Sequence, residues 1–191
     1  MVRKLSLVTE SATPFPISLS AIHTKNFFKG AVHMKLITSH LFNDLLVKAG
    51  TNVRKRTNHN IHESEADPVQ RLFIAARLGS YFRPHRHTLK SEFALVIRGL
   101  FDLLIFDDES RLTERVTIGP GANVFAFDMP PNIWHSWIPR ADESVFFETK
   151  QGPYDAQTAA EFAPWSPVEG APEVKAFVAR LQNARVGDYV A

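Results

Sequence analysis

The chain of 191 residues contains no cysteine. This excludes disulfides, thiolate metal sites and a cysteine nucleophile, so any metal ligand has to be nitrogen or oxygen. The apolar runs are also far shorter than the roughly 20 residues that a transmembrane helix needs. Since the lack of cysteine fits a reducing compartment, we expect a soluble, cytoplasmic protein that does not enter a membrane.

A strong charge of either sign is also missing, because the formal net charge is only +2. Residues 1–33 contribute +3 of it, so residues 34–191 carry −1 and show no basic stripe. We therefore expect no nucleic-acid partner, despite the sequence pI of 9.0. The length suits one domain that is large enough to bury a core of its own.

The first 33 residues have no uninterrupted apolar core, because Glu10 and two prolines break it. A secretory signal is therefore not expected. We interpret residues 1–33 as a disordered extension or the product of a mis-set start codon and exclude them from the fold. The remaining chain divides into a predicted barrel with a leading helix (34–151) and a tail with a helix that packs on the barrel (152–191).

Hydrophobic periodicity predicts two helices that flank a set of strands. The first helix is expected to start at a Thr38 or Ser39 cap, to run to about residue 49 and to stop at Gly50. The second is expected over roughly 173–183. Between them the period changes to two, and short strands at regular spacing favour a sandwich or barrel. The expected strands are 53–62, 69–78, 92–98, 100–106, 111–118, 122–128, 133–138 and 144–150.

Four potential metal ligands fall on one pattern within these strands. His85 and His87 are two residues apart, so on an extended chain both side chains project to the same face. Glu92 opens the next strand, and His135 follows a turn that contains two prolines. A lone His-x-His pair would be read as chance, but four ligands together predict a site for one divalent first-row ion: Fe, Mn, Co, Ni, Cu or Zn. Four protein ligands on an octahedral ion leave two positions open, as a catalytic metal requires.

The spacing of these ligands between Gly79 and Gly99 resembles the first sequence motif of the cupin superfamily. The second motif, around His135, is looser, because Asn132 stands where cupins usually have glycine and Pro139 where they often have asparagine. Asparagine is tolerable there because it also enters the left-handed region. In cupins a small barrel holds one metal through three histidines and a glutamate. The resemblance implies an all-β fold: a cupin-type double-stranded antiparallel β-barrel (jelly roll) with a short N-terminal helix and a C-terminal helix.

Seven segments between Met34 and Leu181 carry a closer resemblance. They are Met34-Lys-Leu-Ile37, the ladder Arg56, Asn58, Asn60, His62, Pro68-Val-Gln-Arg71, Arg83-Pro-His-Arg-His87, Phe106-Asp-Asp108, Gly152-Pro-Tyr154 and Phe162-Ala-Pro-Trp165. In these segments the chain resembles the WbuC family of cupin fold metalloproteins. This implies a setting in surface polysaccharide (O-antigen) synthesis and a sugar, nucleotide sugar or related intermediate as substrate. The family's reaction is not established, and a homodimer is compatible with the resemblance.

The ladder that begins at Arg56 forms one polar face of a strand, because its four members alternate. This face is either a solvated edge or a wall of the barrel mouth that binds a sugar hydroxyl, carboxylate or phosphate. We name Arg56, Asn58 and Asn60 as candidate substrate-binding residues and His62 as the candidate catalytic residue, either a general base or a partner of the ligands. Since unpartnered burial of these polar groups would be costly, we expect them to face the same cavity as the metal.

Alternation places two further side chains on the ligand face, Tyr81 before His85 and Arg98 after Glu92. Both are candidate substrate-binding residues, although an arginine at a barrel end more often pairs with acids. By the same alternation, the side chain of Trp134 is expected to point away from the metal and that of Trp137 to lie on the same side of the strand as His135. For both tryptophans, packing is the default role. The aromatic tail is expected to be pinned to the barrel, where it closes one mouth or covers a sheet edge.

Three functions are compatible with these residues. The favoured one is a metal-dependent enzyme that isomerises or epimerises a sugar, with the ion as Lewis acid and His62 or Glu92 as proton carrier. The second is an Fe-dependent dioxygenase. The third is a non-catalytic cupin that binds or senses a small molecule, and turnover of a candidate sugar would separate it from the other two.

Overall fold

Alternating apolar residues build two antiparallel sheets of five strands each. The computed structural model describes residues 34–191, so the expectation for residues 1–33 lies outside the described residues. Within the described range, Ile37–Ala191 form one compact unit. Its elements are α1 (Ser39–Thr51), β1 (Arg56–Asn60), β2 (Val69–Ala76), β3 (His85–Arg86), β4 (Glu92–Arg98), β5 (Phe101–Phe106), β6 (Leu112–Ile118), β7 (Ala126–Met129), β8 (Trp134–Pro139), β9 (Ser144–Gln151), β10 (Glu161–Phe162) and α2 (Val174–Asn183).

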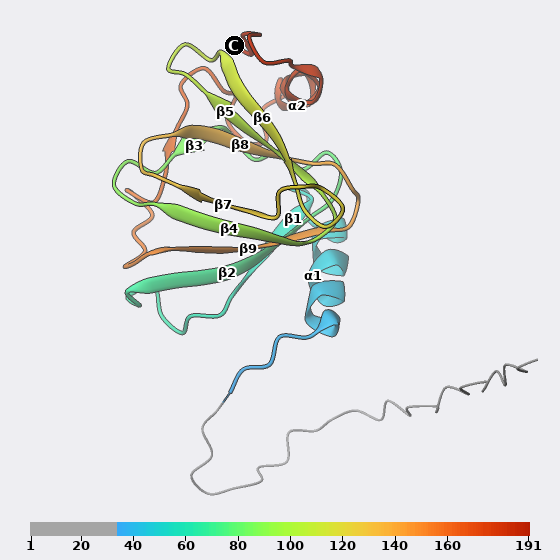
Figure 1. Cartoon of the computed structure of the whole chain (residues 1–191), viewed down its shortest axis with the longest axis vertical. Coiled ribbons are helices and arrows are strands. Elements are labelled where there is room, and N and C mark those ends of the chain that lie inside the picture. Colours follow the sequence, from blue (N-terminus) through green and yellow to red (C-terminus); the bar gives the residue numbers. More distant parts are fainter. Residues whose placement is uncertain (1–33) are drawn as a thin grey trace, which may run out of the picture. The chain divides into compact units, whose positions relative to one another are not determined.

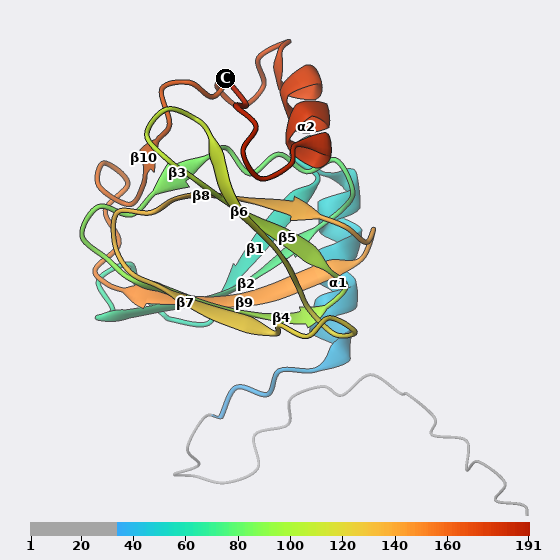
Figure 2. The same ribbon diagram turned by 45° about the horizontal axis from the view of Figure 1, so that its top comes forward.

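The two sheets face each other and enclose the interior of a barrel (Figure 1, Figure 2). One sheet has the order β1-β2-β9-β4-β7 and the other β10-β3-β8-β5-β6. β9 lies between β2 and β4, and β8 lies between β3 and β5, so the chain repeatedly crosses from one sheet to the other. This is the jelly-roll connectivity of a double-stranded antiparallel barrel. The predicted fold class is confirmed.

Apolar side chains form three layers around these sheets. The barrel interior contains Trp137 stacked on Phe146, with ring centroids 4.3 Å apart. α1 buries Leu45 and Leu46 against the outer face of the first sheet, and α2 buries Phe177 against the second sheet. In the part of the chain that the structure describes, no helix is long and apolar enough to cross a membrane.

The limits of several elements differ from the sequence prediction. Thr38 occupies the N-cap position of α1, but its side chain makes no capping hydrogen bond. α1 continues past Gly50, which does not adopt the positive φ that would end a helix. The expected strand 122–128 begins only at Ala126, because the chain first closes a turn in which the Gly119 amide donates to the Val124 carbonyl at 2.8 Å.

The two glycines that bound the first motif have different steric surroundings. Both have positive φ, 77° at Gly79 and 70° at Gly99. A Cβ at Gly99 would lie 2.6 Å from the carbonyl oxygen of Glu143, whereas a Cβ at Gly79 would meet only the flexible side chain of Lys55, at 3.3 Å. Gly99 therefore needs both the left-handed backbone and the missing side chain.

We expect Gly99→Ala to cost about 2–4 kcal/mol of unfolding free energy, from the unfavourable φ plus the clash with fixed backbone. Gly79→Ala should cost only about 1–2 kcal/mol, the penalty of the left-handed conformation. Urea denaturation of both variants beside the wild type measures the difference. Equal losses would contradict the steric argument.

Candidate metal centre

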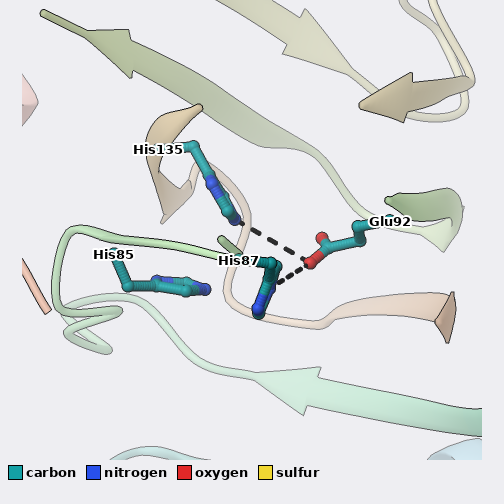
Figure 3. Close-up of side chains that lie close together, drawn as sticks. All are labelled: His85, His87, Glu92 and His135. Carbon is teal, nitrogen blue, oxygen red and sulfur yellow. Dashed lines mark hydrogen bonds and ion pairs between the residues drawn. The ribbon is translucent and has the colours of Figure 1, made fainter. Parts of the chain in front are cut away.

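Four side chains that could hold a metal ion come from both sheets of the barrel. Their ligand atoms lie within 4.8 Å of one another, and Figure 3 shows the side chains pointing toward one another. β3 and β8 pair so that His85 and His135 are directly opposite, with ring centroids 4.3 Å apart. Asn132 has a φ of 71°, as the turn before β8 requires. The cluster consists of the residues predicted from the motif: His85, His87, Glu92 and His135.

Each histidine of the cluster is held in one tautomer by a backbone carbonyl. A carbonyl oxygen only accepts hydrogen bonds, so each Nδ1 carries the proton and each Nε2 retains its lone pair. Such outer hydrogen bonds orient histidine ligands in metal sites. The donor and acceptor pairs are His85 with Arg83 (2.9 Å), His87 with Ala159 (2.6 Å) and His135 with Ile133 (2.9 Å).

The donor atoms at the centre of the cluster are arranged as a cation would require. Among the described residues, Oε1 of Glu92 and Nε2 of His135 are buried without a hydrogen-bond partner. Nε2 of His87 lies 2.8 Å from Oε2 of Glu92, although in this tautomer both atoms are acceptors. Lone pairs at this distance repel each other unless a cation lies among them. Three imidazoles and one carboxylate suit a divalent first-row ion, so the four residues fit a metal.

Burial and neighbouring charges together set the pKa values of the candidate ligands. It lowers the pKa of His85 well below the usual value, and the neighbouring His135 and His87 lower it further. Burial also lowers the pKa of His135. For Glu92 burial alone would raise the pKa, but the nearby ammonium of Lys150 holds it below the usual range. His85 and His135 therefore offer neutral imidazoles and Glu92 an ionised carboxylate, which are the forms that bind metal.

A charged pair beside the cluster was not predicted from the sequence. Lys150 on β9 lies opposite Glu92 on β4, and its Nζ is 2.5 Å from Oε1 of Glu148 and 3.7 Å from Oε2 of Glu92. Burial would lower the pKa of Lys150, but the carboxylates of Glu148 and Glu92 raise it above the usual value. Burial and the charge of Glu92 raise the pKa of Glu148. The sequence predicts only that Glu148 and Lys150 belong to a strand and indicates no role for them at the site.

Two adjoining cavities lie against this pair and share Asn58, Leu72 and Glu148 in their walls. The first, about 350 Å³, is lined by Asn60, His62 and Lys150 among others. The second has a volume of about 300 Å³. Its lining residues include Arg56, His85 and Trp137.

The polar ladder of β1 therefore lies along these cavities, partly beside a candidate metal ligand. Asn58 donates from Nδ2 to Oδ1 of Asn60 at 2.9 Å. Nδ1 of His62 lies 3.0 Å from the backbone nitrogen and from the carbonyl oxygen of Arg71, which anchors the ring. The guanidinium of Arg56 is already paired, because it lies 2.8 Å from Oε1 of Glu169.

The structure does not bring Tyr81 and Arg98 to the site. A register shift between Val96 and Arg98 breaks the alternation on β4, and the Arg98 guanidinium contacts Asn43 and Glu143 instead. The Tyr81 hydroxyl donates to the Pro167 carbonyl at 2.9 Å. Neither side chain lines either cavity. Both side chains are engaged with other parts of the fold, and their assignment as substrate-binding residues stays a prediction.

The tail contributes to the site in two ways. Its β10 pairs with β3, with Phe162 opposite His85, so the tail extends a sheet edge. Tyr154 and Ala159 also line the larger cavity, so the tail forms part of its wall.

Trp134 packs toward the tail, with its ring centroid 6.4 Å from that of Trp165, and thus faces away from the barrel interior, as expected.

Comparisons with known proteins bear on the fold. The family described as a domain of unknown function (DUF6016) matches residues 37–118, and no curated protein matches the chain. Protein SO0799 from Shewanella oneidensis is 16% identical with a TM-score of 0.51, over 75% of this chain and 97% of that chain. KdgF from Halomonas sp. is 16% identical with a TM-score of 0.42, over 53% of this chain and 82% of that chain. A cupin superfamily protein from Desulfitobacterium hafniense is 11% identical with a TM-score of 0.41, over 50% and 76%.

At such identities, similarity to the Shewanella protein supports the jelly-roll fold and says nothing about activity. The strand order and the ligand cluster therefore remain the basis for a cupin-type barrel that could bind a metal ion. These comparisons do not confirm the closer resemblance to the WbuC family.

Proposed function

We propose that this protein is a metal-dependent cupin enzyme that acts on a sugar, nucleotide sugar or related intermediate of surface polysaccharide synthesis. The observation that carries the proposal is the convergence of three Nε2 atoms and one carboxylate beside a polar cavity. The resemblance to the WbuC family, given by the sequence segments above, supplies the substrate class.

One set of residues in the site would hold the ion, and another set would bind the substrate. His85, His87, Glu92 and His135 would hold the ion, which when bound acts as a Lewis acid on a substrate oxygen. The backbone carbonyls that accept from the three Nδ1 atoms keep the rings in place. The amides of β1 line the cavity and offer donors and acceptors to substrate hydroxyls.

His62 is the stronger candidate for the proton carrier that isomerisation or epimerisation needs. Glu92 is a poor base, because its pKa is held below the usual range and its oxygens face the metal centre. His62 lines the cavity, is 8% exposed and is anchored through Nδ1, which leaves the rest of its ring to exchange a proton.

The test is turnover by metal-loaded protein of a panel of monosaccharides and sugar nucleotides, followed by NMR. We expect one member to be converted, and His62→Gln to lower kcat at least about 100-fold without changing the metal content. His59→Gln, an exposed histidine three residues earlier on β1, is the matched control.

The outcomes separate the remaining functions. Full activity of His62→Gln would remove the proton role from His62. Oxygen uptake coupled to substrate loss would favour an Fe-dependent dioxygenase instead. Binding of a panel member without conversion would favour a non-catalytic binding cupin.

A further inference from the structure

Lys150 and Glu148 form a charged wall between the metal centre and the larger cavity. Nζ of Lys150 lies 3.5 Å from Nε2 of His87 and 3.7 Å from Oε2 of Glu92, so it contacts two candidate ligand atoms. It also lines the cavity, as does Glu148, whose Oε1 lies 2.5 Å from Nζ. The side chains of Lys150 and Glu148 are 22% and 9% exposed. Glu148 thus holds a mostly buried ammonium where metal and substrate would meet.

The net charge of the wall and of the neighbouring ligand Glu92, taken together, changes sign when a divalent ion is present. The carboxylates of Glu92 and Glu148 and the ammonium of Lys150 together carry one negative charge. A divalent ion converts this into one positive charge, in surroundings where net charge is poorly solvated. The remaining charged side chains of the cavity wall, Glu65 and Lys90, oppose each other. A loaded site is therefore complementary to an anion with a single charge.

The other cationic groups near these cavities add little net positive charge for a more highly charged ligand. The second cavity includes Arg54 and Arg56 in its lining, but both guanidiniums share the single carboxylate of Glu169, at 2.8 Å in each case, so that these three side chains keep a net charge of only +1. The rest of the larger cavity offers mainly neutral polar groups suited to hydroxyls, among them Asn58, Asn60 and Gln70. The larger cavity thus offers too little positive charge for a diphosphate, whereas its charge matches one carboxylate on a hydroxylated chain.

We propose that this site selects a small sugar acid, a carboxylate on a polyhydroxylated chain, over neutral sugars and nucleotide sugars. Lys150 is the residue that determines this specificity by binding the ligand's carboxylate beside the metal, with Glu148 as its positioning residue. The inference rests on the proposed function and narrows its substrate class.

The test compares two probes with the same carbon chain, gluconate and glucitol, by calorimetry on the zinc-loaded full chain. In the wild type, gluconate is expected to bind at least about tenfold tighter, the worth of one hydrogen bond to a charged group. Lys150→Met should reduce this ratio below about threefold, whereas Lys150→Arg, which keeps the charge, should preserve a preference for the acid. The control Lys48→Met removes an exposed lysine from α1 and should leave the ratio unchanged.

Several results would overturn the inference. They are equal binding of gluconate and glucitol by the wild type, an undiminished ratio in folded Lys150→Met, and tighter binding of UDP-glucose than of gluconate. Circular dichroism shows whether Lys150→Met is folded. If it is not, the ratio measured with Lys150→Arg still tests the inference. Elemental analysis before any probe is added separates the two proposals: a wild type that takes up no zinc contradicts the proposed function itself, and the inference with it.

Discussion

Replacing His85 and His87 together by alanine is expected to lower the metal content of the purified protein from about one divalent ion per chain to less than about a tenth. The change removes two of the four converging donors and leaves only Glu92 and His135, too few to hold a first-row ion firmly. Elemental analysis of wild type and variant after identical purification measures the effect.

The matched control removes two imidazoles from exposed positions. His40→Ala plus His59→Ala should keep the full metal content, because neither residue belongs to the cluster. Both double variants should remain folded, since the barrel has an apolar core apart from the ligands. Equal metal content in wild type and His85→Ala plus His87→Ala would refute the assignment of the site.

The largest loss of stability is expected from Trp137→Ala. Trp137 is 2% exposed, stacks on Phe146 with rings inclined by 14°, and meets Phe101 edge-on at 5.3 Å. Truncation removes this contact area and leaves a cavity in the barrel interior, at a cost of about 3–5 kcal/mol. The free energy of unfolding from urea titration is the measurement.

Phe125→Ala is the control for this prediction, because Phe125 is also aromatic but 55% exposed. Its loss should change the unfolding free energy by about 0.5 kcal/mol or less. Comparable destabilisation by both variants would show that the interior stack contributes little beyond ordinary surface packing.

The all-β class and the cluster of candidate ligands could be predicted from the sequence because both depend on local spacing, whereas the cupin-type barrel was implied by the family resemblance. Residues two apart on a strand share a face, which brings His85 and His87 together without knowledge of the rest of the chain. The turn at Asn132 could be anticipated for the same reason, since only a few residue types enter the left-handed region.

The missed parts of the site depend on distant contacts. β9 buries side chains on both faces, Val145 under α1 and Phe146 in the barrel, so its alternation does not show that Glu148 and Lys150 face inward. Arg98 was misplaced because a register shift in β4 reverses the expected face, and this shift has no clear signature in sequence. The carbonyl of Ala159 carries no side-chain signal at all.

The hydrogen bond from His87 to Ala159 has a consequence for the biosynthesis of the protein. A ribosome releases all four ligands before it releases Ala159 and β10, which lie later in the chain. Until then the ring of His87 has no carbonyl to fix its tautomer, and β3 has no partner on its outer edge. The complete set of oriented donors therefore exists only after translation has passed this point.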